Sequence, residues 1–308
     1  MTQFTSRVAY IGLGNMGSGM ATNIAIKGNL EKPLLLFNRS PARAEKLVND
    51  LPQGKAKVAA SISDAIDASD IIFMSLGDDN AVFGTVGTAL KNDVKDKIFI
   101  DCSTIARQST DKVAEQVNAA GAGFIACPVF GSPLQCQQGN IVCCPAGPAQ
   151  LVERILPLCE GVMGRATIPL LDKEPSTASA LKCIGNSILF DAVQAVAEGH
   201  VLAQKSGVGS DALQKFIQLF FAPCVPYSER MLNGVYYQSE HPPFSVDHAR
   251  KDIRFALDLA KDYDVPMRAL QVADDYYAAC QEHMDGEKAD ISALFGAVRK
   301  ASGLPFEA

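Results

Sequence analysis

The chain has 308 residues, which exceeds the usual size of one domain and predicts two. Its hydrophobic fraction of 48% and charged fraction of 20% are typical of a soluble globular protein, and no run reaches the roughly 18 apolar residues of a membrane span. A net charge of −6 without a block of Lys or Arg argues against nucleic acid as a direct partner. Residues 1–7 are too few and too polar for a signal or transit peptide, so we expect a cytoplasmic protein.

The first predicted element is a strand at residues 8–11, followed by a glycine turn and a helix that continues to Lys27. Between strand and helix the glycines have the spacing GxGxxG of a dinucleotide-binding βα unit. The first glycine permits the tight turn, the second lets the backbone approach a pyrophosphate, and the third lets the helix pack against its strand. N–H groups at the helix N-terminus then face the anion. The predicted cofactor-binding residues of this turn are Gly12, Leu13, Gly14, Asn15, Met16 and Gly17.

The end of the second strand, predicted at residues 33–37, indicates which dinucleotide binds. About 20 residues past the glycines, an NAD-binding chain places Asp or Glu on the ribose hydroxyls. Here the sequence is Asn38, Arg39 and Ser40, with no acid. Arg39 can donate charge-assisted hydrogen bonds to a 2′-phosphate, with Asn38 and Ser40 as neutral partners. We therefore predict NADP(H), with NAD(H) as the less favoured cofactor and a solvated surface arginine as the alternative.

Strand and helix patterns alternate through the rest of the first half. Each short apolar strand precedes a helix, which predicts a parallel sheet covered on both faces. The strand at 70–74 ends near Leu76 and Gly77, and such strand ends face the ligand crevice of a doubly wound sheet. The further predicted elements are helices at 41–50, 63–68, 108–120 and 148–159, strands at 56–58, 97–100, 123–128, 141–146 and 166–170, and a loop at 129–140.

The second half is predicted to be all-helical. An apolar helical pattern runs from Ser176 to about Lys205, and a helix that is apolar on nearly all faces must be buried against something. We expect a dinucleotide-binding domain at residues 1–172, a helical substrate and dimerisation domain at 173–308 that begins with this interdomain helix, and a homodimer or homotetramer. Further helices are predicted at 211–221, 226–232, 246–263, 266–281 and 290–301.

Within the long helix, Lys182 has no acidic residue three or four positions away, and Asn186 lies on its face. A buried ammonium without a counter-ion has a lowered pKa, which suits a proton donor or acceptor near neutral pH. Gly185 costs helix stability, which close approach of a ligand would explain. Position alone leaves open a lysine that reaches water from the helix end.

Nine cysteines without a CxxC pair predict reduced thiols rather than disulfides. The four histidines are not at ligand spacing from one another, so no metal site is expected.

These residues together resemble the β-hydroxyacid dehydrogenase family of the 6-phosphogluconate dehydrogenase superfamily, which includes 3-hydroxyisobutyrate dehydrogenases and tartronate semialdehyde reductases. The ordered motifs are GLGNMGSGMA, NRS, DCST at Asp101–Thr104, PVFGS at Pro128–Ser132, KxxxN at Lys182 and Asn186, and KD at Lys251 and Asp252. The resemblance implies hydride transfer between nicotinamide and a carbonyl or alcohol carbon of a small molecule. It implies Lys182 as general acid, Asn186 as its hydrogen-bonding companion, and Thr104 and Lys251 against the cofactor. The substrate would lie against Ser103, Phe130, Gly131 and Ser132.

Two departures from the family pattern concern the substrate. The family's DAPVSGG loop reads Ala126 to Ser132 here, with Phe130 in place of a hydroxyl donor, and the first asparagine of KxxNN is Gly185. Both changes favour a bulkier or less charged carbonyl compound over a small hydroxy acid. An imine reductase is the second candidate enzyme class, although members of that group generally lack the catalytic lysine. A non-catalytic NADP(H)-binding protein is the alternative from another class.

Overall fold

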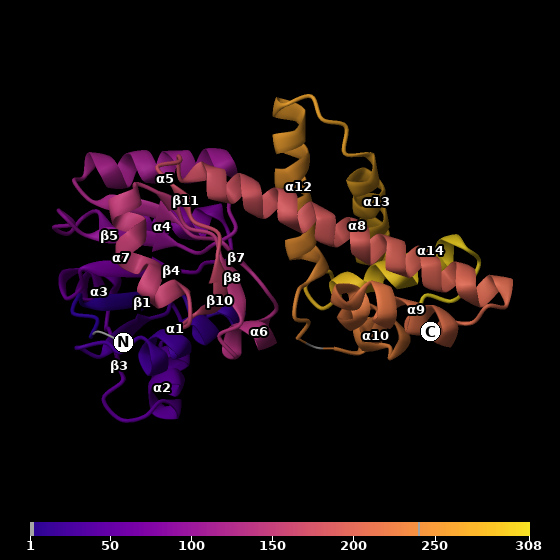
Figure 1. The fold of residues 1–308 in the computed structure, drawn as a ribbon, viewed down its shortest axis with the longest axis horizontal. Helices are drawn as coiled ribbons and strands as arrows, with labels where there is room; N and C mark the ends of the chain where they lie inside the picture. The colour runs from indigo at the N-terminus through magenta and orange to yellow at the C-terminus, as the bar shows by residue number, and fades with distance from the viewer. Residues whose placement is uncertain (1–2, 240) are drawn as a thin grey trace. The chain divides into compact units, whose positions relative to one another are not determined.

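The computed structural model describes residues 3–239 and 241–308 and divides into two compact units, Met1–Lys182 and Cys183–Ala308 (Figure 1). The division falls inside the long helix α8 (Ser176–Ser206), whereas the sequence pattern placed the boundary before that helix, at residue 172. Composition changes where the helix begins, but the first turns of α8 pack with the N-terminal unit: Ala178 belongs to one of its hydrophobic clusters.

The N-terminal unit is built on an eight-stranded sheet in the order β11-β9-β6-β5-β4-β1-β2-β3. Six strands pair in parallel: β1 (Val8–Ile11), β2 (Leu34–Phe37), β3 (Ala56–Val58), β4 (Ile71–Met74), β5 (Ile98–Asp101) and β6 (Gly123–Ala126). The short strand β9 (Ala146–Gly147) pairs antiparallel with β6 and parallel with β11 (Leu170–Leu171). The predicted parallel sheet is confirmed for its six main strands, and only its far edge departs from that pattern.

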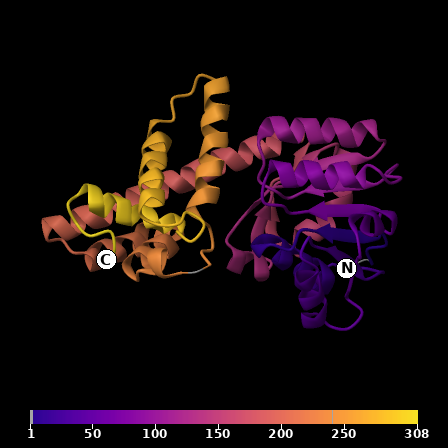
Figure 2. The same ribbon diagram turned by 180° about the vertical axis from the view of Figure 1, so that it is seen from behind.

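Alternate residues of each strand enter two hydrophobic clusters, one on each face of the sheet, because successive side chains of a strand point to opposite sides. One cluster joins Tyr10 and Phe73 to the helices α1 (Asn15–Lys27), α2 (Pro41–Asp50) and α7 (Ala149–Cys159). The other joins Ile72 and Phe99 to α3 (Ile62–Asp67), α4 (Asp79–Ala89) and α5 (Arg107–Ala119). Seen from behind, α4 and α5 lie side by side (Figure 2). The Rossmann-type architecture expected from the sequence is confirmed.

Three parts of this unit differ from the sequence prediction. The expected strands at 141–146 and 166–170 each divide into two short strands that lie in different sheets. The expected loop at 129–140 contains β7 (Val129–Phe130) and the short helix α6 (Pro133–Gln137), and β7 joins β8 (Ile141–Cys143) and β10 (Gly164–Thr167) in a second sheet. Strand β7 is too short for its alternation to be read from sequence, while the start of α6 is marked by a capping box. Helix α4 was not predicted, although Asp78 caps it by accepting from the Ala81 N–H.

The C-terminal unit contains helices and no strand among residues 183–239 and 241–308, as predicted. Its cluster packs the inner side of α8, including Phe190, Val193 and Ala197, against the later helices. Those helices are α9 (Ser210–Phe220), α10 (Val225–Leu232), α11 (Val235–Gln238), α12 (Val246–Asp262), α13 (Arg268–His283) and α14 (Leu294–Ala301), with 3₁₀ turns at Ala222–Cys224 and Ile291–Ala293. The four-residue α11 was not predicted, because one turn has no periodicity of its own.

Helix α8 is long and apolar enough to cross a membrane by length and composition. The same test is passed by core helices of soluble proteins, and 44% of its apolar window is buried inside the fold. The outer side keeps apolar residues in contact with solvent, since Ile184, Ile188 and Leu202 are exposed.

Candidate active site

The glycine turn between β1 and α1 is shaped by contacts that only glycine permits. Gly12 has a φ of +93°, and a Cβ there would lie 2.3 Å from the Ser75 carbonyl oxygen. A Cβ on Gly17 would lie 2.0 Å from the Gly12 carbonyl oxygen, so the helix crosses the turn with no room for a side chain. Beside Gly14, in contrast, a Cβ would meet no atom within 4 Å. The turn is therefore closely packed at its two ends and open in its middle.

The N-terminus of α1 at this turn has the character of an anion site. Its N-cap is Gly14, which offers no side-chain cap, and its first turn has no acidic residue. The N–H groups of that turn and the positive end of the helix dipole favour a negative group in the open space beside Gly14. These features fit the pyrophosphate of a dinucleotide.

The end of β2 lies against the same turn. The Asn38 side chain accepts a hydrogen bond from the Leu13 N–H at 2.9 Å and donates to the Ser40 carbonyl oxygen at 3.1 Å. Asn38 thus ties β2 to the glycine turn. Arg39 is exposed, and Ser40 is the N-cap of α2 without a side-chain cap bond. Arg39 and the Ser40 hydroxyl are the groups here that a 2′-phosphate can use.

The ends of β4 and β5 are joined through Ser103. Its hydroxyl accepts from the Leu76 N–H at 2.9 Å, and its own N–H donates to Asp101 Oδ1 at 2.9 Å. Burial raises the pKa of the Asp101 carboxyl to about 6, against the opposing effect of the hydrogen bonds from Ser103. Ser103 was expected to contact substrate, and in the structure it holds the two strand ends together. Thr104 and Leu76 are half-buried beside it, and Gly77 is exposed.

Lys182 is half-buried and lies against the substrate loop expected from the sequence. Its Nζ donates to the Val129 carbonyl oxygen at 2.9 Å and stands 4.5 Å from the centre of the Phe130 ring. A carbonyl oxygen and an aromatic face both attract an ammonium group. The structure therefore brings Lys182 and Phe130 together, although 52 positions separate them in the chain.

The other two residues of that loop shape its turn. Gly131 has a φ of +148°, which disfavours any residue with a side chain. As the cap of α6, the Ser132 hydroxyl accepts from the Gln135 N–H at 3.2 Å, and the Ser132 N–H donates to Gln135 Oε1 at 2.8 Å. Because its oxygen serves this cap, Ser132 has mainly its hydroxyl hydrogen to offer a substrate.

In the helical unit, Asp252 connects the two remaining predicted residues. Its Oδ2 accepts from Asn186 Nδ2 at 2.7 Å, and its Oδ1 lies 3.2 Å from Lys251 Nζ. Asp252 is only 4% exposed, so solvent screens its ion pair with Lys251 only weakly. The KD motif pointed to Asp252, but no role followed from the sequence, because the contact with Asn186 spans two helices.

Comparison with known proteins identifies the family of both units. Residues 7–169 match the family described as the NAD binding domain of 6-phosphogluconate dehydrogenase. Residues 176–298 match the family described as NAD-binding of NADP-dependent 3-hydroxyisobutyrate dehydrogenase. The NADH-dependent oxidoreductase ucdB of Aspergillus ustus is 32% identical over 293 residues, covering 94% of this chain and 98% of that protein. Glyoxylate/succinic semialdehyde reductase 1 of Arabidopsis thaliana is 28% identical over 295 residues, covering 95% and 98%.

Solved structures share the fold. The 3-hydroxyisobutyrate dehydrogenase of Mycobacterium tuberculosis with L-serine has a TM-score of 0.80 at 24% identity, covering 97% of this chain and 100% of that one. An imine reductase from a Pseudomonas species has a TM-score of 0.61 at 20% identity, covering 96% and 99%. At these identities the likeness concerns the fold alone.

Proposed function

This chain belongs to the β-hydroxyacid dehydrogenase family of nicotinamide-dependent oxidoreductases, and we propose that it is an NADP(H)-dependent reductase in which Lys182 is the general acid. The proposed substrate is a semialdehyde, a 3-oxo acid or a bulkier carbonyl compound. The observation that carries the proposal is the position of Lys182 Nζ against the Val129 carbonyl oxygen and the Phe130 ring, beside the proposed substrate loop.

In the proposed mechanism the nicotinamide cofactor, when bound, supplies the hydride and the protein supplies the proton. Lys182 then donates a proton from Nζ to the oxygen of the substrate carbonyl as that oxygen gains negative charge, and it takes the proton back in the oxidative direction. The Val129 carbonyl oxygen and the Phe130 ring orient the ammonium group. We further propose that Asp252 orients Asn186, and that Thr104 and Lys251 contact the cofactor.

The Phe130→Ser variant tests the substrate class. Serine restores the hydroxyl donor that the family has at this position. The kcat/KM on short carboxylated substrates should therefore rise relative to that on bulky carbonyls, by an amount that corresponds to about 1–3 kcal/mol of transition-state stabilisation. The measurement is kcat/KM on one substrate of each kind. Phe130→Leu is the matched control: it removes the ring beside Lys182 without adding a donor, and should not produce that shift. An unchanged preference in Phe130→Ser would mean that the ring does not face the substrate.

A substrate panel with NADPH tests the function itself. Aldehydes, keto acids and imines are supplied separately, and NADPH oxidation and cofactor binding are both measured. We expect turnover of carbonyl compounds. The shared fold favours an imine reductase as the second candidate, and turnover of imines alone would support it. Stoichiometric NADPH binding without turnover of any substrate class would contradict both and favour a non-catalytic binding protein.

We also propose that the protein is a homodimer or a homotetramer, through a surface that we call the α9 patch. It consists of Phe216, Leu219, Phe220 and Phe221, of which Phe220 is 73% exposed, and the rings of Phe216 and Phe220 stack at 5.1 Å. A group of neighbouring exposed apolar side chains is costly in water and typical of an interface between protein chains. The nine free cysteines support a reducing compartment, so we propose a cytoplasmic location.

Leu219→Glu is expected to dissociate the assembly. A charge inside an apolar interface loses its hydration, so sedimentation should change from the dimer or tetramer to the monomer. Gln218→Glu places the same charge on an exposed position of the same helix and should leave the assembly intact. An unmodified protein that sediments as a compact monomer at micromolar concentration would refute this interface.

A further inference from the structure

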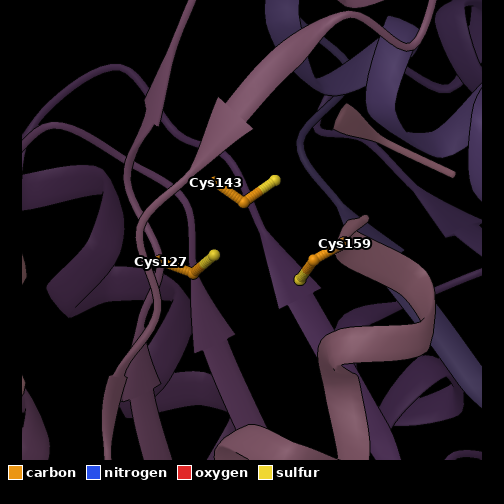
Figure 3. A group of neighbouring side chains, drawn as sticks. All are labelled: Cys127, Cys143 and Cys159. Atoms are coloured by element: carbon orange, nitrogen blue, oxygen red, sulfur yellow. The ribbon is translucent and has the colours of Figure 1, made fainter. Parts of the chain in front are cut away.

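Three buried cysteines from separate segments of the N-terminal unit meet at one place (Figure 3). Cys127 follows β6, Cys143 ends β8 and Cys159 ends α7. Their sulfur atoms all lie within 4.8 Å of one another, and none of the three side chains is exposed. Cys102 follows β5, and the neighbouring Cys127 thiol raises its pKa. Cys127, Cys143 and Cys159 form one sulfur cluster, which we call the thiol cluster, and Cys102 is adjacent to it.

The spacing of the thiol cluster matches that of sulfur ligands around one metal ion. With metal–sulfur bonds of about 2.3 Å, two sulfurs on a tetrahedral ion lie about 3.8 Å apart. The limit of 4.8 Å in the structure is about 1 Å larger, a difference that small rotations of the side chains can close. Because the ligands come from two strand ends and a helix end, the fold brings them together before any ion arrives.

The chemistry of the thiol cluster restricts which ion it can hold. Thiolates are soft ligands and select soft or borderline cations over Mg²⁺ or Ca²⁺, which prefer oxygen. The full burial of the three cysteines is typical of a closed structural site rather than a catalytic one with an open position.

We propose that Cys127, Cys143 and Cys159 form a buried site for one thiophilic d¹⁰ metal ion. The ion is either Cu⁺, held by these three sulfurs, or Zn²⁺, with Cys102 as a fourth donor. On binding, the ion loses its water ligands, and thiol protons pass to the buffer as sulfur–metal bonds form. The site links β6 to β8, and β8 pairs with the strand that carries Phe130. The ion would therefore hold the base of the proposed substrate loop.

The test uses the reduced full-length chain, titrated with Zn²⁺ or with Cu⁺ against a competing chelator. We expect one ion per chain, and a loss of affinity of at least about 100-fold in Cys159→Ser, since even residues that only orient metal ligands cost about 10–100-fold. Cys102→Ser distinguishes the two ions: it should lower the affinity for four-coordinate Zn²⁺ and leave the affinity for three-coordinate Cu⁺ nearly unchanged. Cys280→Ser, a buried cysteine of the helical unit, is the control and should bind like the unmodified protein.

A second measurement needs no variant, in case a cluster substitution prevents folding. Cd²⁺ added to the unmodified protein should produce the ultraviolet charge-transfer band of cadmium thiolates, with an intensity that corresponds to three or four sulfurs per ion. Absence of this band, or cluster variants that bind metal as tightly as the unmodified protein, would overturn the proposal. These readouts do not use enzyme activity, so they are independent of the proposed reductase function.

Discussion

Lys182→Ala is expected to lower kcat by about 10²–10⁴-fold, the usual contribution of a positioned general acid. The substrate oxygen must gain a proton as hydride arrives, and a methyl group cannot supply one. NADPH affinity should stay nearly unchanged, since the glycine turn and Arg39 are separate from Lys182. The measurements are steady-state kcat on a confirmed substrate and NADPH binding by titration.

Two further variants isolate the proton transfer at Lys182. Lys182→Arg should not restore activity, because a guanidinium group stays protonated and does not exchange a proton near neutral pH. Lys205→Ala removes a lysine from the last turn of the same helix, where its Nζ donates to the Ser302 carbonyl oxygen, and should keep kcat. If Lys182→Ala has a near-normal kcat, the ammonium group serves only to pack against Phe130, and a bound water becomes the candidate donor.

The second large effect is expected for the cofactor. If Arg39 donates to the 2′-phosphate, Arg39→Ala should weaken NADPH binding by about 1.5–3 kcal/mol, which is the contribution of a hydrogen bond to a charged group. At about 1.4 kcal/mol per tenfold change, this corresponds to about 10- to 150-fold in Kd. NADH binding should hardly change, because NADH has no 2′-phosphate.

The surroundings of Arg39 support this expectation. Arg39 and the Ser40 hydroxyl stand at the N-terminus of α2, where the helix dipole favours an anion, and the first turn has no acidic residue. Arg43, also exposed, supplies a second cation in that turn, so Arg39→Ala with Arg43→Ala should weaken NADPH further. Arg39→Lys keeps the charge and should lose less. The relative from Aspergillus ustus is named an NADH-dependent enzyme, and equal affinities of the unmodified protein for the two cofactors would refute the choice of NADP(H).

Local sequence patterns predicted most of the fold. The alternation of apolar strands and helices predicted the parallel sheet, and the loss of strand patterns after residue 172 predicted the helical half. Three of the four elements that were not predicted are short: β7, α6 and α11 have two, five and four residues, whereas α4 has eleven. The short segments have too few residues for a period, and their structure depends on neighbours such as β8.

The chemistry of the candidate site was predictable only where it is local. The sequence by itself determined the glycine turn, because strand, GxGxxG and helix follow one another within 20 residues, and it identified Lys182 as a candidate. Phe130 became a candidate through the family resemblance. It could not show that Lys182 Nζ contacts Phe130, that Asp252 holds Asn186, or that Ser103 joins two strands.

The thiol cluster shows most clearly what only the tertiary structure decided. Local spacing gave no reason to expect a metal site, because Cys127, Cys143 and Cys159 are 16 positions apart in sequence and match no ligand motif. They meet because the end of β6 in the main sheet, the end of β8 in the second sheet and the C-terminal end of α7 lie at one place. Turn and helix signals are encoded by neighbours in the chain, whereas a site assembled from several segments exists only once packing has fixed where each segment ends.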